Sequence, residues 1–213
     1  LLLSAIVDPN PVLFLTPKAL LRQKSLPGEE IPGEPDERAL AKKIDAPLGD
    51  RSAWKPEWPD TPDLFIPIGK SKTVRPGRDV TCVTYGRMVT LCKKAADELA
   101  KESSGRGSGL PAIETEVIDL RSLYPYDWPA LKESIARTHR VLFVNEDTEV
   151  TNFGEHLIRR TIEELFYDLH AAPKLLAGAN TPGVGLADNM EMASVPQKAG
   201  ILQAMRELAQ HEP

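Results

Sequence analysis

A strand-like pattern and a helix-like pattern follow each other near the middle of the chain. Residues 79–85 are β-branched and mostly apolar, and the run stops at Gly86. Helical spacing begins directly after it, with apolar side chains at Met88, Cys92, Ala95, Ala96 and Leu99. A buried strand, a tight glycine turn and an amphipathic helix form the first half of a βαβ crossover. The pattern therefore predicts parallel strand pairing.

The same alternation continues along the rest of the chain. Apolar runs predict further strands at 116–120, 141–145 and 173–177. Residues 66–74 predict an edge segment, since their alternating lysines would protect an exposed sheet edge. Residues 66–213 thus predict an α/β domain with an open, mainly parallel sheet and helices on both faces.

Capping residues place the helices between these strands. Asp127 is predicted to cap one helix, and Asn152 with Glu155 resembles a capping box at the start of another. Ser194 and Gln197 are predicted to cap the last helix. The helix after the capping box is expected to turn one apolar stripe to the core: Ile158, Ile162, Leu165, Phe166 and Leu169.

The first third of the chain has a different composition. Residues 1–24 read as the end of a helix followed by a buried strand at 12–16, and we interpret them as the remnant of an upstream domain or a strand lent to another sheet. Residues 25–65 are a proline-rich linker or insertion, with one short helix expected at 37–44. Trp54 and Trp58 are expected to pin this segment to a neighbouring surface.

Composition narrows the class of protein. The chain has 213 residues and a net charge of −5, and it carries no basic stripe, which argues against nucleic-acid binding. Its two cysteines cannot form a disulfide framework, so a reducing compartment is expected. No apolar run approaches membrane-spanning length, and the opening residues lack the features of a signal peptide. The absence of a starting methionine suggests a piece of a longer chain.

Three polar loops follow predicted strands, at 85–87, at 119–127 and at 145–149 leading to 152–154. Ligands and partners of such sheets meet the loops at the carboxyl ends of the strands. The loops can form one surface that grips a ligand or another subunit. Alternatively, they are turns and caps that need Asp, Asn and Gly for backbone reasons.

Motifs of catalysis and cofactor binding are missing from the sequence. It has no Gly-x-Ser-x-Gly elbow, no His or Cys pair at metal-ligand spacing and no Gly-x-Gly-x-x-Gly turn. None of the four histidines has an obvious partner in sequence. We therefore predict no catalytic, cofactor-binding or metal-binding residue, and a domain whose role is assembly.

Several motifs, taken in order, resemble a known family. They are Asp8-Pro-Asn-Pro-Val-Leu-Phe-Leu, Ile68-Gly-Lys-Ser-Lys, Asp79-Val-Thr-Cys-Val-Thr-Tyr-Gly, Val117-Ile-Asp-Leu-Arg-Ser-Leu-Tyr-Pro-Tyr-Asp127, Glu146, Phe153-Gly-Glu, Thr181-Pro182 and the run from Glu191 to Pro196. Together they resemble the C-terminal part of the β subunit of the thiamine-diphosphate-dependent E1 component of 2-oxo acid dehydrogenase complexes. The domain itself is similar to the transketolase C-terminal domain.

The resemblance implies a part in oxidative decarboxylation of a 2-oxo acid, such as pyruvate or a branched-chain 2-oxo acid, with acyl transfer to lipoyl. Thiamine diphosphate and Mg²⁺ would be held by domains outside this sequence, so none is expected to bind here, and the piece alone is expected to be inactive. The implied partners are the E1 α subunit, a second β subunit and the acyltransferase E2 core, with neither nucleic acid nor membrane. The implied location is the cytoplasm or, alternatively, the mitochondrial matrix.

The resemblance also assigns interface roles to seven residues: Tyr85, Gly86, Asp119, Arg121, Glu146, Phe153 and Gly154. The chain departs from the family in its long segment 27–67 and in Gly183-Val-Gly185, where the family commonly has an aromatic residue or another proline. Two alternatives stay open. One is the terminal domain of a transketolase or deoxyxylulose-phosphate synthase, and the other is a non-enzymatic anion- or nucleotide-binding module.

Overall fold

The computed structural model describes residues 1–17, 20, 65–103 and 112–212. The chain divides into two compact units, Leu1–Pro67 and Ile68–Pro213. The helix expected at 37–44, the two tryptophans of the linker and most of the glycine-rich loop at 103–111 lie outside the described residues.

The first unit contains helix α1 (Leu2–Val7), and Ser4 Oγ donates a hydrogen bond to the carbonyl of Ile66 at 2.6 Å. The strand expected at 12–16 is wrong. Those residues have no regular structure, and their large apolar side chains are exposed, Leu13 by 86%. A strand needs a neighbour for its backbone groups, and no described segment pairs with this one.

The second unit is built on a sheet of five described strands in the order β1-β3-β2-β4-β5. The strands are β1 (Lys72–Arg75), β2 (Val80–Thr84), β3 (Thr115–Asp119), β4 (Val141–Thr148) and β5 (Lys174–Gly178). Only β1 runs antiparallel to its neighbour, and it lies at an edge, as the lysine pattern indicated. The predicted fold class is therefore confirmed.

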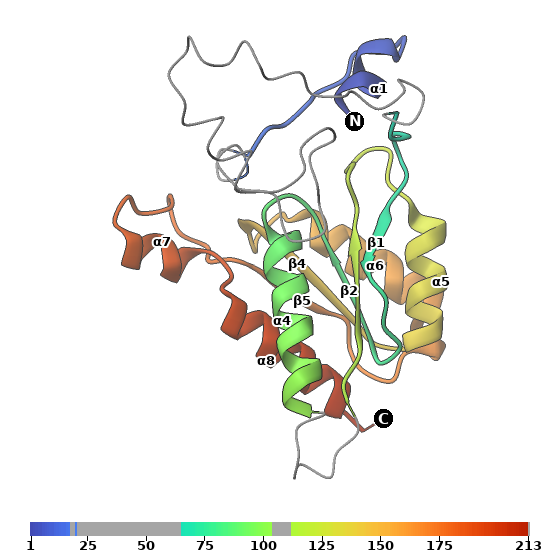
Figure 1. The fold of residues 1–213 in the computed structure, drawn as a ribbon, viewed down its shortest axis with the longest axis vertical. Coiled ribbons are helices and arrows are strands. Elements are labelled where there is room, and N and C mark those ends of the chain that lie inside the picture. Colours follow the sequence, from blue (N-terminus) through green and yellow to red (C-terminus); the bar gives the residue numbers. More distant parts are fainter. Residues whose placement is uncertain (18–19, 21–64, 104–111, 213) are drawn as a thin grey trace, which may run out of the picture. The chain divides into compact units, whose positions relative to one another are not determined.

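Helices cover both faces of the sheet (Figure 1). They are α4 (Met88–Ser103) and α8 (Lys198–Gln210) on one face, and α5 (Trp128–Thr138) and α6 (Phe153–Leu165) on the other. Successive side chains of a strand point to opposite faces, so Cys82 packs on the α4 and α8 side while Val83 packs on the α5 and α6 side. The two apolar layers thus hold the sheet in place, and the polar loops extend from the carboxyl ends of its strands.

The side chain of Asp127 does not cap α5 as expected. Asp127 occupies the N-cap position, but its carboxylate accepts a hydrogen bond from the backbone N–H of Ser71 at 3.2 Å and lies 3.6 Å from Lys70 Nζ. The carboxylate therefore ties the segment before β1 to the start of α5.

The predicted apolar stripe of α6 is confirmed only in part, since Leu165 is buried and Ile158 and Leu169 pack against the core, whereas Ile162 and Phe166 do not. The buried residues of the helix are Gly154, Leu157, Thr161 and Leu165, whereas Ile162 is 41% exposed. Thr161 can be buried because its hydroxyl donates to the carbonyl of Leu157 at 2.8 Å. The helix ends at Leu165, and a 3₁₀ turn (η3, Phe166–Asp168) leaves Phe166 60% exposed.

The last part of the chain contains one helix that the sequence analysis did not predict, α7 (Asp188–Ser194). Ser194 ends α7, and its hydroxyl donates to the carbonyl of Met190. Gln197 occupies the N-cap position of α8, but its side chain donates to the carbonyl of Val195 and not to the helix. The side chains of Ser194 and Gln197 thus make no capping bond to α8.

Candidate interface at the carboxyl edge of the sheet

Aromatic rings join two of the predicted loops to the start of α6. The rings of Tyr85 and Phe153 meet edge to face, with centroids 6.5 Å apart, and Tyr126 meets Phe153 in the same way at 5.4 Å. His156 stacks on Phe153 at 5.7 Å. Because β2 and β3 are parallel, the residues that follow them reach the same edge of the sheet. We call these four side chains the aromatic cluster.

Gly86 has a backbone reason for its identity. Its φ of 59° lies in the left-handed region, which glycine adopts without steric cost, and its carbonyl accepts a hydrogen bond from Val89 N–H as α4 begins. In this turn Tyr85 contacts the ring of Phe153, and Arg87 faces Glu146.

Arg87 connects three elements of this edge. Its Nη1 lies 3.1 Å from the carboxylate of Glu191 on α7 and 3.7 Å from that of Glu146 on β4. Glu146 was predicted as an interface residue, but its connection to α7 was not, because the sequence analysis did not include that helix. One guanidinium therefore faces two carboxylates.

Asp119 and Arg121 interact with each other at the end of β3. Asp119 Oδ1 accepts a hydrogen bond from the backbone N–H of Arg121 at 3.0 Å, and Arg121 has a φ of 60°. Burial raises the pKa of the Asp119 carboxyl, and this backbone bond and the charges of Arg121 and Lys72 partly oppose the rise. The described contacts do not join this pair to the aromatic cluster.

An amide pair holds the loop after β4. Asn145 and Asn152 are buried, and each donates to the side-chain oxygen of the other at 2.7 Å. Asn152 also donates to the carbonyl of Thr148 at 2.7 Å. The capping box predicted from Asn152 and Glu155 is confirmed, since Asn152 caps the helix and its own N–H donates to Glu155 at 3.1 Å. We call the two asparagines the amide clasp.

Gly154 lies beneath this loop and is buried. A Cβ at this position would be 2.4 Å from Leu175 Cδ1 and 2.9 Å from Asn152 Oδ1. The close approach of α6 to β5 therefore requires glycine here. Gly154 shapes the edge through its backbone and presents no side chain to a partner.

Burial and two carboxylates of the acidic loop shift the pKa of Tyr85. Burial raises the pKa of its hydroxyl to about 12, and the negative charges of Asp147 and Glu146 add to the rise. Tyr85 is therefore a neutral hydrogen-bonding group throughout the physiological range.

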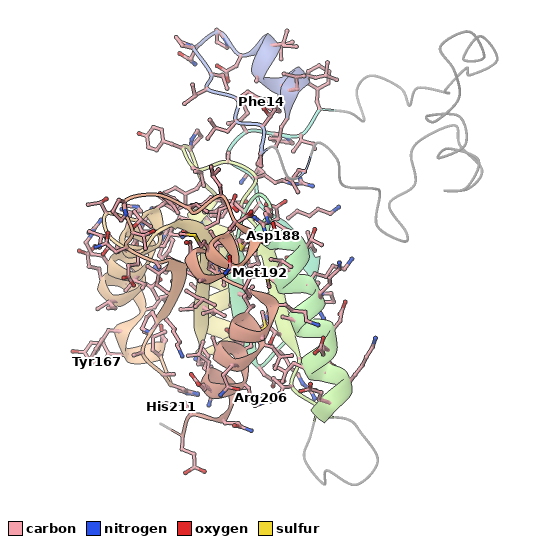
Figure 2. The ribbon with its side chains drawn as sticks, turned by 90° about the vertical axis from the view of Figure 1, so that its left-hand side faces the viewer. Phe14, Tyr167, Asp188, Met192, Arg206 and His211 are labelled. Atoms are coloured by element: carbon pink, nitrogen blue, oxygen red, sulfur yellow. The ribbon has the colours of Figure 1, made fainter. Side chains whose placement is uncertain are left out.

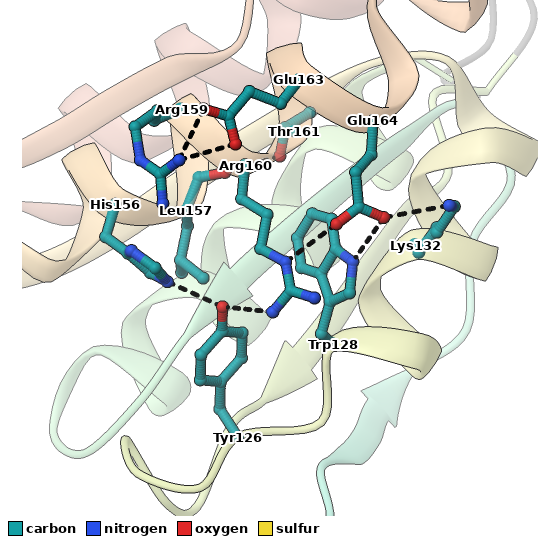
Figure 3. A network of polar contacts seen from close by, with 10 residues as sticks. All are labelled: Tyr126, Trp128, Lys132, His156, Leu157, Arg159, Arg160, Thr161, Glu163 and Glu164. Carbon is teal, nitrogen blue, oxygen red and sulfur yellow. Dashed lines mark hydrogen bonds and ion pairs between the residues drawn. The ribbon is translucent and has the colours of Figure 1, made fainter.

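A polar network extends from the aromatic cluster across α5 and α6 (Figure 3). Arg160 Nη1 donates to Tyr126 Oη at 2.8 Å, and the same oxygen lies 2.7 Å from His156 Nε2. The guanidinium of Arg160 also lies over the ring of Trp128, 4.5 Å from its centroid. The network fixes Tyr126 from two sides.

Glu164 closes the network at its other end. Its carboxylate accepts hydrogen bonds from Trp128 Nε1 at 3.0 Å, from Arg160 Nε at 2.9 Å and from Lys132 Nζ at 3.0 Å. These donors, the indole first, lower the pKa of Glu164 to about 2. The sequence analysis did not identify this network, although His156, Arg160 and Glu164 follow each other at four-residue spacing, which places them on one helix face.

The described residues include no group of three or more His, Cys, Asp or Glu side chains that could hold a metal ion. None of the described helices is both long enough and apolar enough to cross a membrane. What the edge offers is a surface of fixed aromatic, amide and charged side chains.

Comparison with known proteins decides the family. The sequence matches the family model described as "Transketolase, C-terminal domain" over residues 69–201. The chain belongs to the transketolase C-terminal domain family. A solved "Split gene transketolase, inactive beta4 tetramer" has a similar fold, with a TM-score of 0.59 and 21% identity over 72% of this chain and 46% of that one.

This transketolase C-terminal domain chain is also homologous to E1 β subunits. It is 33% identical to the "Pyruvate dehydrogenase E1 component subunit beta, mitochondrial" of Pisum sativum, over 97% of the chain and 47% of that protein. It is 32% identical to the pyruvate dehydrogenase E1 component subunit beta of Rhizobium meliloti, over 97% of the chain and 36% of that protein. Identity with the 2-oxoisovalerate dehydrogenase subunit beta of Bacillus subtilis is 35%, over 70% of the chain and 42% of that protein. The chain thus spans less than half the length of these relatives.

Proposed function

We propose that this chain is the C-terminal part of the β subunit of a 2-oxo acid dehydrogenase E1 component. In this role it belongs to an enzyme that oxidatively decarboxylates a 2-oxo acid, such as pyruvate or a branched-chain 2-oxo acid, and transfers the acyl group to lipoyl. The observation that carries the proposal is the identity of 32–35% with pyruvate and 2-oxoisovalerate dehydrogenase β subunits. The chain works in the cytoplasm or in the mitochondrial matrix.

Within that enzyme the chain serves assembly with the α subunit, a second β subunit and the acyltransferase core. The edge formed by Tyr85, Phe153 and Glu146 supports this role. Interfaces favour aromatic side chains and arginine, and here the two rings contact each other and Arg87 is paired with Glu146 before a partner binds. Tyr124 adds an aromatic ring, 93% exposed, on the loop between β3 and α5. Gly86 and Gly154 contribute by shaping the backbone beneath this surface.

The residues of this edge do not fit the pyrophosphate of thiamine diphosphate. An incoming phosphate would meet the carboxylates of Glu146, Asp147 and Glu149. The nearby guanidinium of Arg87 already faces two carboxylates. These carboxylates would repel the negative charges of the pyrophosphate, so we assign the cofactor and its Mg²⁺ to the other parts of the enzyme.

The assay for the enzymatic part uses the purified chain with thiamine diphosphate, Mg²⁺ and pyruvate or 2-oxoisovalerate. We expect no decarboxylation, measured by reduction of an artificial electron acceptor. Turnover by the pure chain would contradict the proposal.

The assay for assembly measures binding of the chain to an E1 α subunit by calorimetry. Phe153→Ala removes the central ring of the aromatic cluster, and we expect affinity to fall by about tenfold or more, as truncation of an aromatic anchor does. Tyr167→Ala is the matched control, since Tyr167 is 97% exposed on η3, away from this edge. Equal affinities of the two variants would refute the placement of the interface.

A further inference from the structure

Helix α7 packs none of its side chains into the core. It contains no buried residue, and it projects beside the N-terminal end of α8 (Figure 1). Met190 is 56% exposed and Met192 is 59% exposed. Just before the helix, Val184 is 54% exposed and Leu186 is fully exposed. Four apolar side chains therefore face solvent within nine residues of chain, which is more than scattered surface residues explain.

The segment is nevertheless held in a defined shape. A Cβ on Gly185 would be 2.4 Å from Met190 Cβ, so the chain before α7 folds closely against the helix. Ala179 N–H donates to the carbonyl of Ser194 at 2.8 Å, which fixes the end of the helix to the end of β5. Arg87, in the turn before α4, forms an ion pair with Glu191. The apolar side chains are thus presented by a fixed platform.

The surroundings of this platform are acidic. Residues 145–149 and 186–194 together carry five carboxylates and no Lys, Arg or His. The two segments are neighbours, because Arg87 lies between Glu146 and Glu191. Both segments are also bound to the end of β5, since Glu149 N–H donates to the carbonyl of Gly178 and the next residue, Ala179, donates its N–H to the carbonyl of Ser194. Within the part of the chain that the structure describes, Asp147, Glu149 and Asp188 form no ion pair.

We propose that this surface docks a basic amphipathic helix of a partner chain. We call it the α7 surface, which consists of four apolar residues and five carboxylates: Val184, Leu186, Met190, Met192, Glu146, Asp147, Glu149, Asp188 and Glu191. Figure 2 shows Asp188 and Met192 on the helix. Unbranched methionine side chains adapt to the apolar face of a helix, and Lys or Arg on the flanks of that helix would meet the carboxylates.

Charge selects this occupant over two others. A second copy of the chain carries the same carboxylates and a net charge of −5, so it would be repelled at this surface. An anionic membrane would be repelled for the same reason. The proposal does not depend on the E1 assignment, because it rests on the side chains of α7 and of the loop after β4.

The four methionines of the chain provide the test and its internal control. Met190 and Met192 are exposed, whereas Met88 and Met205 are fully buried. We would label the methionine methyl groups with ¹³C in the full chain and titrate it with a helical Leu/Lys peptide of about 14 residues, four turns long. We expect the Met190 and Met192 signals to shift, the Met88 and Met205 signals to stay, and affinity to fall as salt is raised.

Variants separate the apolar and the charged contributions. Met190→Gln with Met192→Gln is expected to weaken binding by about tenfold. Asp188→Lys is expected to weaken it severalfold, while Glu133→Lys, the same change on an exposed position of α5, leaves it within about twofold. Unchanged Met88 and Met205 signals would verify that each variant is folded.

Three results would overturn the proposal. The first is a Leu/Glu peptide that binds as well as the Leu/Lys peptide, and the second is a titration that leaves Met190 and Met192 unmoved. The third is self-association in sedimentation velocity that the methionine substitutions abolish, which would assign the surface to a second copy.

Discussion

Replacement of Gly154 by alanine tests how α6 packs on the sheet. The new Cβ would overlap Leu175 Cδ1 at 2.4 Å and crowd Asn152 Oδ1 at 2.9 Å. Overpacking of this kind costs about 1–3 kcal/mol. Alanine in a helix recovers about 0.5–1 kcal/mol relative to glycine, so the net loss of unfolding free energy is about 1–2 kcal/mol. For a domain of this size, that lowers Tm by roughly 3–6 °C.

The assay is thermal and urea denaturation of Gly154→Ala beside Gly183→Ala. Gly183 is the matched control, because a Cβ there would have no atom within 4 Å. We expect the control to stay within about 0.5 kcal/mol of the natural chain. Equal stability of the two variants would refute the reasoning.

A double variant identifies the atom responsible. Leu175→Ala removes the Cδ1 that the new Cβ would strike, at the cost of the apolar contacts of Leu175. The double variant with Gly154→Ala should therefore lose less stability than the sum of the two single variants, by about 1 kcal/mol. Strict additivity would show that the clash is not with Leu175.

Two further predictions follow from pKa shifts. The pKa of Glu164 is lowered from 4.5 to about 2, so its contribution to stability is complete above pH 4.5 and is lost as pH falls toward 2. The unfolding midpoints of the natural chain and Glu164→Gln should therefore converge over that range, and a constant gap would contradict the shift. The pKa of Tyr85 is raised from 10 to about 12, so the NMR signal of its ring should show no ionisation up to about pH 11. Glu146→Gln with Asp147→Asn should lower that pKa without restoring 10, because burial is the larger cause.

The sequence predicted those parts of the fold in which local pattern and final environment agree. Every residue of β2 and the first four residues of β4 (141–144) are buried, and all of them are apolar or β-branched, as expected for strands that are covered on both faces. The capping box at Asn152 was found because its two hydrogen bonds join residues three apart. Such signals need no knowledge of distant segments.

The failures arose where a distant segment decides the outcome. Leu157 and Ile162 are both apolar, but α6 turns Leu157 to the core together with Gly154, which lies against Leu175 of β5. Asp127 looked like a cap, but Ser71, 56 residues away in the sequence, takes its carboxylate. Helix α7 has no buried face and therefore no apolar period to detect.

The candidate interface was predicted by location more than by chemistry. Parallel strand order brings the loops to one edge, and the contact of Tyr85 with Phe153 follows from that rule. The polar network of Tyr126, Trp128 and Glu164 could not be predicted in the same way, because it joins α5 to α6 and depends on how the two helices lie side by side.

The amide clasp has a consequence for how this edge responds to its surroundings. Asn145 and Asn152 carry no ionisable group, so acid, alkali and added electrolyte leave their hydrogen bonds unaltered. The charges of the neighbouring carboxylates, in contrast, are shielded by dissolved ions. Salt can therefore change how strongly the loop attracts a charged partner without changing the conformation of the loop, because the hydrogen bonds that hold it are uncharged.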